Sequence, residues 1–319
     1  MGFAHLLTLL IIVSSSSCYL MQNTFKTSFY WYSQKFNGTL DLFYNSEKFE
    51  KNLDTKIIIH GFNENVQMPI YKEMVQKFMA KDNLNVITVD YSYYDWQNNY
   101  LKILHAIPHI GFYLGELLGR LKLSRCITLG RVQIIGYSTG AQIAAHAARK
   151  ANQYTRGAKV GRITALNPTR PGFESILVKD DAKLSANDAR IVDILHTDRN
   201  LGYAESHGSV DFYPNFGDKI QPGCKLVEEK KIYGVGEKDG WKQVLLYDDY
   251  CSLKRSALIY AESIYSDKFI ATKCESWERY TAGDCDNNEK IIYGDDMPGN
   301  AEGSYYFRTN PQSPYALGK

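Results

Sequence analysis

The feature that most constrains this 319-residue chain is the pentapeptide Gly-Tyr-Ser-Thr-Gly at 136–140. A short β-branched run, 132–136, precedes its serine, and an alanine-rich segment with helical spacing, 138–152, follows. Strand, G-x-S-x-G and helix in this order are typical of a serine held on a sharp turn above a sheet. The flanking glycines are needed because the turn leaves no room for side chains. The pattern predicts Ser138 as a nucleophile at a helix amino terminus, where the dipole favours negative charge.

The rest of the chain alternates between strand-like and helix-like segments. Five apolar, non-alternating runs are typical of strands buried on both faces of a parallel sheet: 56–60, 85–90, 132–136, 162–166 and 191–196. Helical spacing is found at 66–81, 99–123 (with a kink expected at Pro108), 138–152 and 252–265. The alternation predicts an α/β fold with a central, mainly parallel sheet flanked by helices. After about residue 216 we expect mostly loops around the last of these helices.

Charge and composition exclude several classes of protein. There are 37 basic and 35 acidic side chains, so no basic stripe for nucleic acid is indicated. Aromatic residues make up 13% of the chain, which argues against disorder. No Cys-x-x-Cys pair or mixed His/Cys cluster occurs, so we expect neither a metal site nor a cofactor.

The amino terminus has the features of a secretory signal. Residues 3–13 are almost continuously apolar, and four serines follow. This run is too short to cross a bilayer but suits a signal peptide, which we place at 1–20. We expect 21–319 to form a single secreted domain with no transmembrane segment. The sequence Asn37-Gly38-Thr39 is an N-glycosylation sequon.

The cysteines support an oxidising compartment. The chain has six, at 18, 126, 224, 251, 274 and 285. If Cys18 leaves with the signal peptide, five remain, and four of these are expected to pair. Four cysteines permit three pairings. Proximity along the chain favours Cys224 with Cys251 and Cys274 with Cys285, leaving Cys126 free.

A second glycine turn follows the first predicted strand, at His60-Gly61-Phe62. The glycine allows close backbone approach, so the Phe62 N–H is a candidate donor for an oxyanion. The Thr139 N–H, directly after the serine, is the other candidate. Together they predict an oxyanion hole beside Ser138.

Several longer segments, read together, resemble the secreted neutral (pancreatic-type) lipase family. They are KIIIHGF, NVITVDYS, VQIIGYSTGAQ, GRITALNPTRPGF and YCSLKRSALIYAESI, and the similarity runs from about residue 29 to 318. The resemblance implies an α/β-hydrolase fold and a carboxylic ester hydrolase. The chain is most similar to short insect members without a carboxy-terminal β-sandwich.

The resemblance also assigns a catalytic triad, which is incomplete here. Ser138 stands at the nucleophile position, but Asn167 holds the acid position and Leu253 holds the base position. A serine hydroxyl is a poor nucleophile unless a base accepts its proton, and leucine cannot do so. We therefore expect an inactive lipase-like protein that binds lipid or a protein partner, or serves for storage as yolk-type proteins do.

Two alternatives remain at this stage. An α/β-hydrolase base comes after the acid in the chain, and no histidine follows His207. Asp198 and His207 are the candidates for a substitute acid and base, which would make the chain a lipase or phospholipase A1-like ester hydrolase. The other alternative is a structural surface protein whose pocket has collapsed.

The resemblance implies two further features. A disulfide between Cys224 and Cys251 would bound a lid over the acyl pocket, spanning 224–251. The family's calcium-type loop maps onto the stretch LSANDA, where Asp188 remains but Ser185 replaces a second aspartate. With half of the carboxylate pair gone, we expect no calcium.

Overall fold

The computed structural model describes residues 27–39, 49–93, 99–174, 178–217, 220–225 and 250–318. The expected signal peptide lies outside these residues, as does the expected lid from 226 to 249. Cys18 lies outside them as well.

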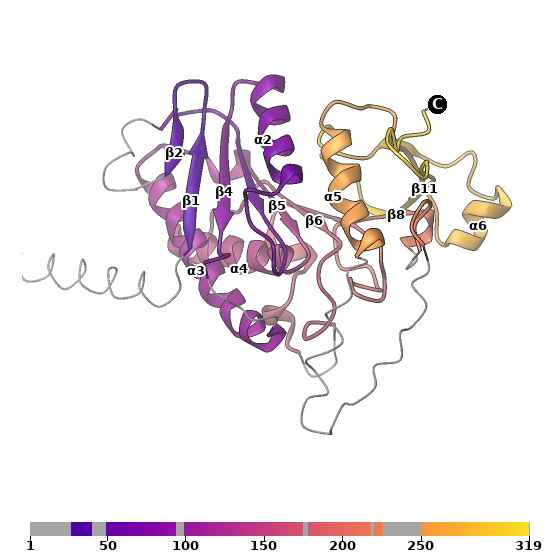
Figure 1. Ribbon diagram of the computed structural model, residues 1–319, viewed down its shortest axis with the longest axis horizontal. Helices are drawn as coiled ribbons and strands as arrows, with labels where there is room; N and C mark the ends of the chain where they lie inside the picture. Colours follow the sequence, from indigo (N-terminus) through magenta and orange to yellow (C-terminus); the bar gives the residue numbers. More distant parts are fainter. Residues whose placement is uncertain are drawn as a thin grey trace, which may run out of the picture.

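The described residues form one 11-stranded sheet in the order β10-β9-β11-β8-β7-β6-β5-β3-β4-β1-β2. The strands are β1 (Ser28–Tyr32), β2 (Asn37–Thr39), β3 (Thr55–Ile59), β4 (Asn85–Asp90), β5 (Val132–Tyr137), β6 (Arg162–Leu166), β7 (Ile191–Leu195), β8 (Val210–Pro214), β9 (Ile270–Lys273), β10 (Lys290–Ile292) and β11 (Gly303–Phe307). Neighbouring strands from β4 through to β11 run parallel, and the two strands at each edge pair antiparallel (Figure 1). This confirms the predicted mainly parallel sheet.

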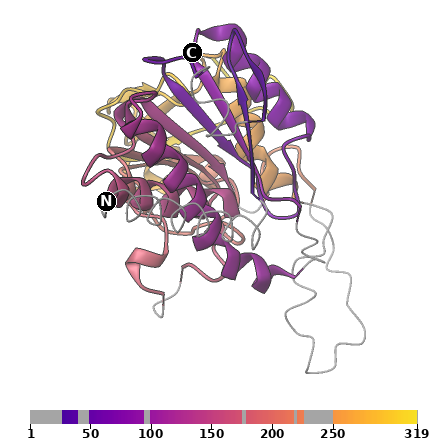
Figure 2. The same cartoon turned by 90° about the vertical axis from the view of Figure 1, so that its left-hand side faces the viewer.

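Helices cover both faces of the sheet. They are α2 (Pro69–Lys81), α3 (Tyr100–Leu123), α4 (Thr139–Tyr154), α5 (Cys251–Ser263) and the short α6 (Trp277–Ala282). In Figure 2, α3 and α4 lie on one face, while α2 and α5 lie on the other. Helix α2 begins three residues later than predicted, because the fixed φ of Pro69 suits the first turn of a helix. Helix α3 continues through Pro108.

The five predicted strands are β3 to β7, each within one residue of its expected bounds. The expectation of mostly loops around one helix after residue 216 missed β9, β10, β11 and the short α6. These strands have three to five residues, and β9 and β10 form an antiparallel edge. Short edge strands lack the continuous apolar run that marks a strand buried on both faces.

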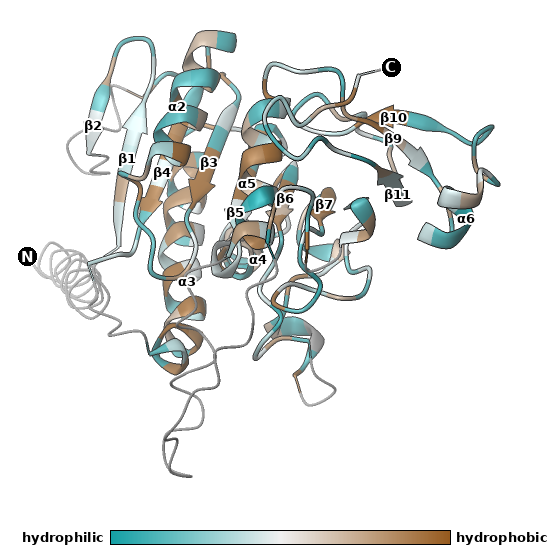
Figure 3. Ribbon diagram, turned by 45° about the vertical axis from the view of Figure 1, so that its right-hand side comes forward, coloured by the Kyte–Doolittle hydropathy of each residue, from teal (hydrophilic) through white to brown (hydrophobic). Residues whose placement is uncertain are grey.

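The central strands carry two apolar cores, one on each face. Ile57 and Ile59 of β3 pack in the core that includes α3 and α4, whereas Ile58 packs with α2 and α5. Side chains alternate between the faces of a strand, so a strand buried on both faces is mostly apolar and any polar side chain in it needs a partner. Figure 3 shows this pattern as brown stretches in β3 and β4, whereas α6, at the far right of the view, is largely teal.

Helix α4 is held in place by very close packing against α3. Gly111, Gly115 and Gly119 of α3 lie four residues apart and face α4. A Cβ atom built on Gly115 would lie 2.5 Å from the carbonyl oxygen of Ala147. The contact therefore leaves no room for a side chain and sets the position of the helix that begins beside Ser138.

The predicted disulfides are confirmed. Cys224 pairs with Cys251 and Cys274 with Cys285, while the buried Cys126 takes no part in these two disulfides. Within the described part of the chain, no helix combines the length and apolarity that a membrane span requires.

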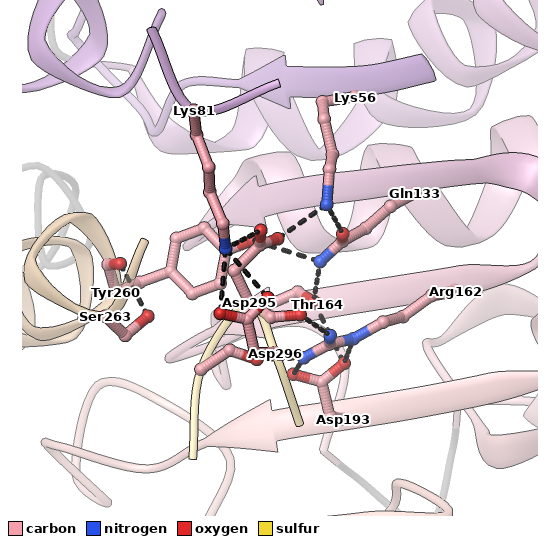
Figure 4. A network of polar contacts seen from close by, with 11 residues as sticks. Lys56, Lys81, Gln133, Arg162, Thr164, Asp193, Tyr260, Ser263, Asp295 and Asp296 are labelled. Carbon is pink, nitrogen blue, oxygen red and sulfur yellow. Dashed lines mark hydrogen bonds and ion pairs between the residues drawn. The ribbon is translucent and has the colours of Figure 1, made fainter. Parts of the chain in front are cut away.

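A buried polar network lies at the amino-terminal ends of the central strands, on the face covered by α2 and α5 (Figure 4). Arg162, at the start of β6, makes a two-pronged ion pair with Asp193 of β7 at 2.6 and 3.0 Å. The same guanidinium donates to the carbonyl oxygens of Gly294 and Asp295 at 2.8 and 3.0 Å. The network thus bonds the segment between β10 and β11 to the middle of the sheet.

Asp295 is the most connected member of this network. Its carboxylate lies 2.6 Å from Lys56 Nζ and 3.1 Å from Lys81 Nζ, and the Tyr260 hydroxyl donates to it at 3.3 Å. Burial by itself raises the pKa of the Asp295 carboxyl, but Lys56, Lys81 and Arg162 together outweigh it and hold the pKa below its ordinary value. The ionised form of Asp295 is therefore part of the folded structure.

Candidate active site

Ser138 lies on a strained turn between β5 and α4, as the pentapeptide predicted. Its φ of 54° and ψ of −115° fall outside the regions that serine ordinarily adopts. A Cβ atom on Gly136 would lie 2.5 Å from the Gly140 carbonyl oxygen, and one on Gly140 would lie 2.5 Å from that of Ile59. Both flanking positions must therefore be glycine. The Ser138 N–H donates to the Leu166 carbonyl at 3.0 Å, which fixes the turn to β6.

The two candidate oxyanion donors stand on segments that are tied together. Thr139 is the first residue of α4, where backbone N–H groups have no acceptor within the helix. Phe62 follows β3 and lines the same cavity as Ser138. The Tyr91 hydroxyl donates to the His60 carbonyl at 2.7 Å and contacts Thr139 Oγ1 at 3.0 Å, bridging the two segments. The two segments therefore lie close together, and the oxyanion hole formed by their N–H groups stays a prediction.

A cavity of about 210 Å³ opens at Ser138. Most of its lining is aromatic or aliphatic, and the full set is Phe62, Asn63, Glu64, Met68, Tyr100, Tyr137, Ser138, Thr169, Pro171, Leu201, Tyr250, Leu253 and Lys254. Burial raises the pKa of the Tyr137 and Tyr250 hydroxyls and raises that of Tyr100 to about 12. The phenols are therefore neutral, and Glu64 and Lys254 are the charged side chains among the lining residues.

Leu253, at the implied base position, points into this cavity from the first turn of α5. Its side chain is 7% exposed and lines the same space as Ser138. Cys251, at the start of the helix, is anchored to Cys224 by the disulfide. The fold therefore brings the base position to the serine, but the side chain there has no atom that accepts a proton.

Asn167, at the implied acid position, is 1% exposed and directly follows β6. Its Oδ1 accepts hydrogen bonds from the N–H groups of Thr197 and Asp198 at 2.8 and 2.7 Å, and its Nδ2 donates to the Asp198 carbonyl at 3.2 Å. Its φ is 48°, a left-handed conformation that asparagine tolerates better than most residues. The amide thus secures the loop that follows β7.

Thr197 connects the acid and base positions. Its hydroxyl lies 3.4 Å from Asn167 Oδ1 and 3.5 Å from the Leu253 carbonyl oxygen. Asn167 is thus linked through Thr197 to the backbone of Leu253, and Leu253 lines the same cavity as Ser138. Neither the amide of Asn167 nor the hydrocarbon side chain of Leu253 can act as an acid or a base.

Comparison with known proteins decides the family. The family model described as Lipase matches residues 23–315.

The chain belongs to the lipase family.

Individual relatives agree with this assignment. A pancreatic triacylglycerol lipase from Equus caballus is 31% identical over 292 residues, covering 85% of this chain and 60% of the relative. Pancreatic lipase-related protein 2 from Bos taurus is 30% identical over 248 residues, covering 75% and 50%. Inactive pancreatic lipase-related protein 1 from Canis lupus familiaris is 28% identical over 249 residues, covering 75% and 50%. The chain spans about half of the length of the curated relatives it matches.

Solved structures of α/β-hydrolase type also match part of the chain. A putative carboxylesterase from Lactobacillus plantarum is 16% identical with a TM-score of 0.34, covering 48% of this chain and 68% of that chain.

The candidate substitutes for the missing groups do not meet at the cavity of this lipase-family chain. The Asp198 carboxylate accepts the N–H groups of Asn200 and Leu201, at 2.9 and 3.2 Å, within its own turn. His207 Nε2 contacts Glu174 Oε1 at 3.3 Å, and its ring packs against Tyr203. Neither Asp198 nor His207 lines the Ser138 cavity.

Two other described histidines, His60 and His196, are engaged in hydrogen bonds of their own. His60 Nδ1 lies 2.8 Å from the Gly61 carbonyl oxygen, which only accepts, so this nitrogen carries the proton. Its Nε2 accepts the Tyr91 N–H at 3.2 Å. His196 bonds the Tyr203 carbonyl oxygen and Asp211 at 2.9 and 2.8 Å. Among the residues lining the Ser138 cavity there is no imidazole.

Three residues of the site were not predicted from the sequence. Glu64 accepts a hydrogen bond from the Gly61 N–H at 3.0 Å and another from the Tyr71 hydroxyl, which fixes the glycine turn. Lys254 lines the cavity beside Leu253, and Thr197 links the triad positions. For Glu64 the sequence offers a weak local signal, a carboxylate three residues after a glycine turn. The roles of Lys254 and Thr197 could not be predicted from the sequence, because they depend on the packing of α5 against the end of β7.

The calcium-type loop is filled by an arginine. Arg149 of α4 forms a two-pronged ion pair with Asp188 at 2.6 and 2.8 Å and donates to the carbonyl oxygens of Asp181 and Lys183. Burial raises the pKa of Asp188, and the guanidinium opposes this effect. A carboxylate and carbonyl oxygens are also the ligands that Ca²⁺ prefers. The guanidinium supplies the positive charge that these oxygens require.

We predict that calcium leaves the thermal unfolding temperature of the protein unchanged, whereas Arg149→Met destabilises it by about 3 kcal/mol because Asp188 stays buried without its partner. Arg149→Lys is expected to be intermediate, since one ammonium cannot serve all of these oxygens. Thermal melts with calcium and with a chelator test both statements. A calcium-dependent rise in the wild-type unfolding temperature would show that the loop binds the metal instead.

Proposed function

We propose that this chain is a catalytically inactive member of the lipase family that holds an acyl lipid in the Ser138 cavity. The observation that carries the proposal is the position of Leu253. It is buried, it lines the same cavity as the serine, and it stands where the base is required.

The remaining polar groups do not replace the base. Of the residues that the structure describes, Glu64 is the one carboxylate in the lining, and it already accepts hydrogen bonds from the Gly61 N–H and the Tyr71 hydroxyl. Asn167 is neutral, so it cannot stabilise an imidazolium by charge even if a base were present. A resting hydroxyl of this kind does not attack an ester at a useful rate.

Lipid binding is supported by the lining of the cavity. Aromatic and aliphatic side chains surround a few polar groups at the serine, which is the composition of a site for an acyl chain with a polar head. The relatives' names include both lipases and an inactive lipase-related protein, so at least one relative is named as having no activity.

We further propose that the protein is secreted. Two disulfides are stable in an oxidising compartment, and the apolar amino-terminal run suits a signal peptide. Asn37 and Thr39 of the sequon are exposed on the edge strand β2, where a glycan would meet no obstacle from the sheet core. Mass spectrometry of secreted protein, before and after removal of N-glycans, tests the modification.

A fluorophosphonate probe tests the inactivity. Wild-type protein is expected to show no labelling at Ser138, because the probe reports an activated serine rather than a resting one. Short- and long-chain esters are expected to be hydrolysed no faster than by Ser138→Ala. Labelling and turnover that both disappear in Ser138→Ala would establish an ester hydrolase with a substitute base and overturn the proposal. Purified protein that neither carries nor binds lipid would favour a protein partner or a storage role.

A further inference from the structure

We propose that the lipid held by this cavity is a free fatty acid, whose carboxylate is bound by Lys254, the Ser138 hydroxyl and the backbone N–H groups of Phe62 and Thr139. The inference rests on the proposed function, since it names the ligand class of the same cavity. It assigns Lys254 as the residue that selects a carboxylate over a neutral ester.

The charges in the cavity favour an anionic head group. Glu64 and Lys254 are the charged lining residues. The Glu64 carboxylate is already bonded by the Gly61 N–H at 3.0 Å and by the Tyr71 hydroxyl. Lys254 is exposed at the cavity and makes no ion pair with a described residue. The acceptors of Glu64 are therefore in use, whereas the ammonium of Lys254 is still available to an anionic group of a ligand.

The substitution of the base changes what the serine can do. In a triad the hydroxyl donates its proton to an imidazole, whose lone pair would also repel an incoming carboxylate. With Leu253 in that place, the Ser138 hydroxyl forms no side-chain hydrogen bond in the described part of the chain. Its hydrogen is then free to be donated to a ligand oxygen.

The oxyanion donors complete the receptor. The Phe62 and Thr139 N–H groups suit an oxygen with negative charge, which a carboxylate carries in its ground state and an ester acquires only in the transition state. Hydrogen bonds to an ionised acceptor are about twice as strong as those to a neutral one. An ester would leave Lys254 unused, whereas a fatty-acid anion would engage all four groups.

The rest of the cavity suits the acyl chain. Tyr100, Tyr137 and Tyr250 line it with Leu201 and Pro171, so the space beyond the polar end is mostly apolar. A carboxylate with an apolar tail matches this division into a polar end and an apolar end. A small inorganic anion would leave the apolar part unfilled.

Calorimetric titration with decanoate and with methyl decanoate at pH 8 tests the inference. Both ligands have the same acyl chain, but only one has a charged head. We expect wild-type protein to bind decanoate on the order of tenfold more tightly than the ester. Lys254→Gln is expected to weaken decanoate binding about threefold to fivefold, as for an exposed charge pair, and to leave the ester unchanged. Ser138→Ala is expected to weaken decanoate binding as well.

Lys290→Gln is the matched control, because Lys290 is exposed on β10 and does not line the cavity. Equal affinity of the wild type for the two ligands would overturn the carboxylate inference while leaving lipid binding intact. Binding of neither ligand would overturn the proposed function and this inference together. A decanoate preference that is unchanged in Lys254→Gln would remove the role assigned to Lys254.

Discussion

The double variant Asn167→Asp, Leu253→His is expected to hydrolyse short-chain esters, whereas the wild-type protein does not. Leu253 already lines the cavity beside Ser138, so an imidazole there lies next to the hydroxyl. An aspartate at 167 would still accept the N–H groups of Thr197 and Asp198, which now bond Asn167 Oδ1. The oxyanion donors and the strained turn are in place without further change.

The single variants show how much of the expected gain in ester hydrolysis each substitution provides. In serine proteases, replacing the triad aspartate by asparagine lowers kcat about 10⁴-fold, because the histidine is held in the wrong tautomer. Leu253→His alone is therefore expected to fall on the order of 10³- to 10⁴-fold below the double variant. Asn167→Asp alone is expected to be inert, since it still lacks a base.

Steady-state hydrolysis of a chromogenic ester, with fluorophosphonate labelling, measures this gain. The matched control carries the same two changes together with Ser138→Ala, and it should have no activity. Circular dichroism establishes that each variant is folded, because Leu253 is a buried position. A folded double variant that neither labels nor turns over would mean that the oxyanion donors or the cavity no longer suit an ester.

Asp295→Asn is expected to destabilise the protein by about 3–5 kcal/mol, the typical cost of breaking a buried ion pair. The Asp295 side chain is 5% exposed and contacts both Lys56 and Lys81, so the substitution leaves the largely buried Lys56 ammonium without its anion and removes one of the two carboxylates that pair with Lys81. Asp296→Asn is a matched control. Asp296 pairs with the same Lys81 at 2.7 Å but is 64% exposed, so its loss is expected to cost less than about 1 kcal/mol. Urea unfolding at neutral pH measures both differences.

The same pair of variants predicts a pH dependence. The pKa of Asp295 is lower in the folded protein than its ordinary value of 3.8, so folding favours the ionised form. This contribution is fully present above the unfolded pKa and is lost as the pH falls through the folded pKa. The difference in unfolding free energy between wild type and Asp295→Asn is therefore expected to shrink below about pH 4. A difference that stays constant down to pH 2 would show that the charge of Asp295 is not what stabilises the segment.

Much of the central sheet was predictable because its strands are buried on both faces. A strand in that position is mostly apolar along its length, and β3 to β7 are marked in the sequence by such runs. The strands at the edges are β1, β2, β9 and β10. Strand β1 pairs with β4, which lies far away in the sequence, whereas the pairs β1–β2 and β9–β10 join strands that are nearer to each other in the sequence. No local pattern marks them, since their residues need to be apolar on one side at most.

The candidate site, like the sheet, could be predicted from the sequence only in part. The position of Ser138 follows from local sterics, because only a glycine-flanked turn between strand and helix fits there. The positions of Asn167 and Leu253 came from the resemblance, and the structure adds how Thr197 joins them. The network around Asp295 was not predicted, because its lysines, arginine and aspartates lie on segments that are brought together only by the fold.

The replacement of an imidazole by a hydrocarbon has a consequence for the medium in which the protein works. Histidine is the side chain whose ordinary pKa lies within the range of biological fluids, and the lining of this cavity contains none. Burial raises the pKa of its phenols, which therefore stay neutral in weakly alkaline surroundings. Because no imidazole among the described lining residues changes its charge there, we expect a bound molecule to be retained equally well from weakly acidic to weakly alkaline surroundings.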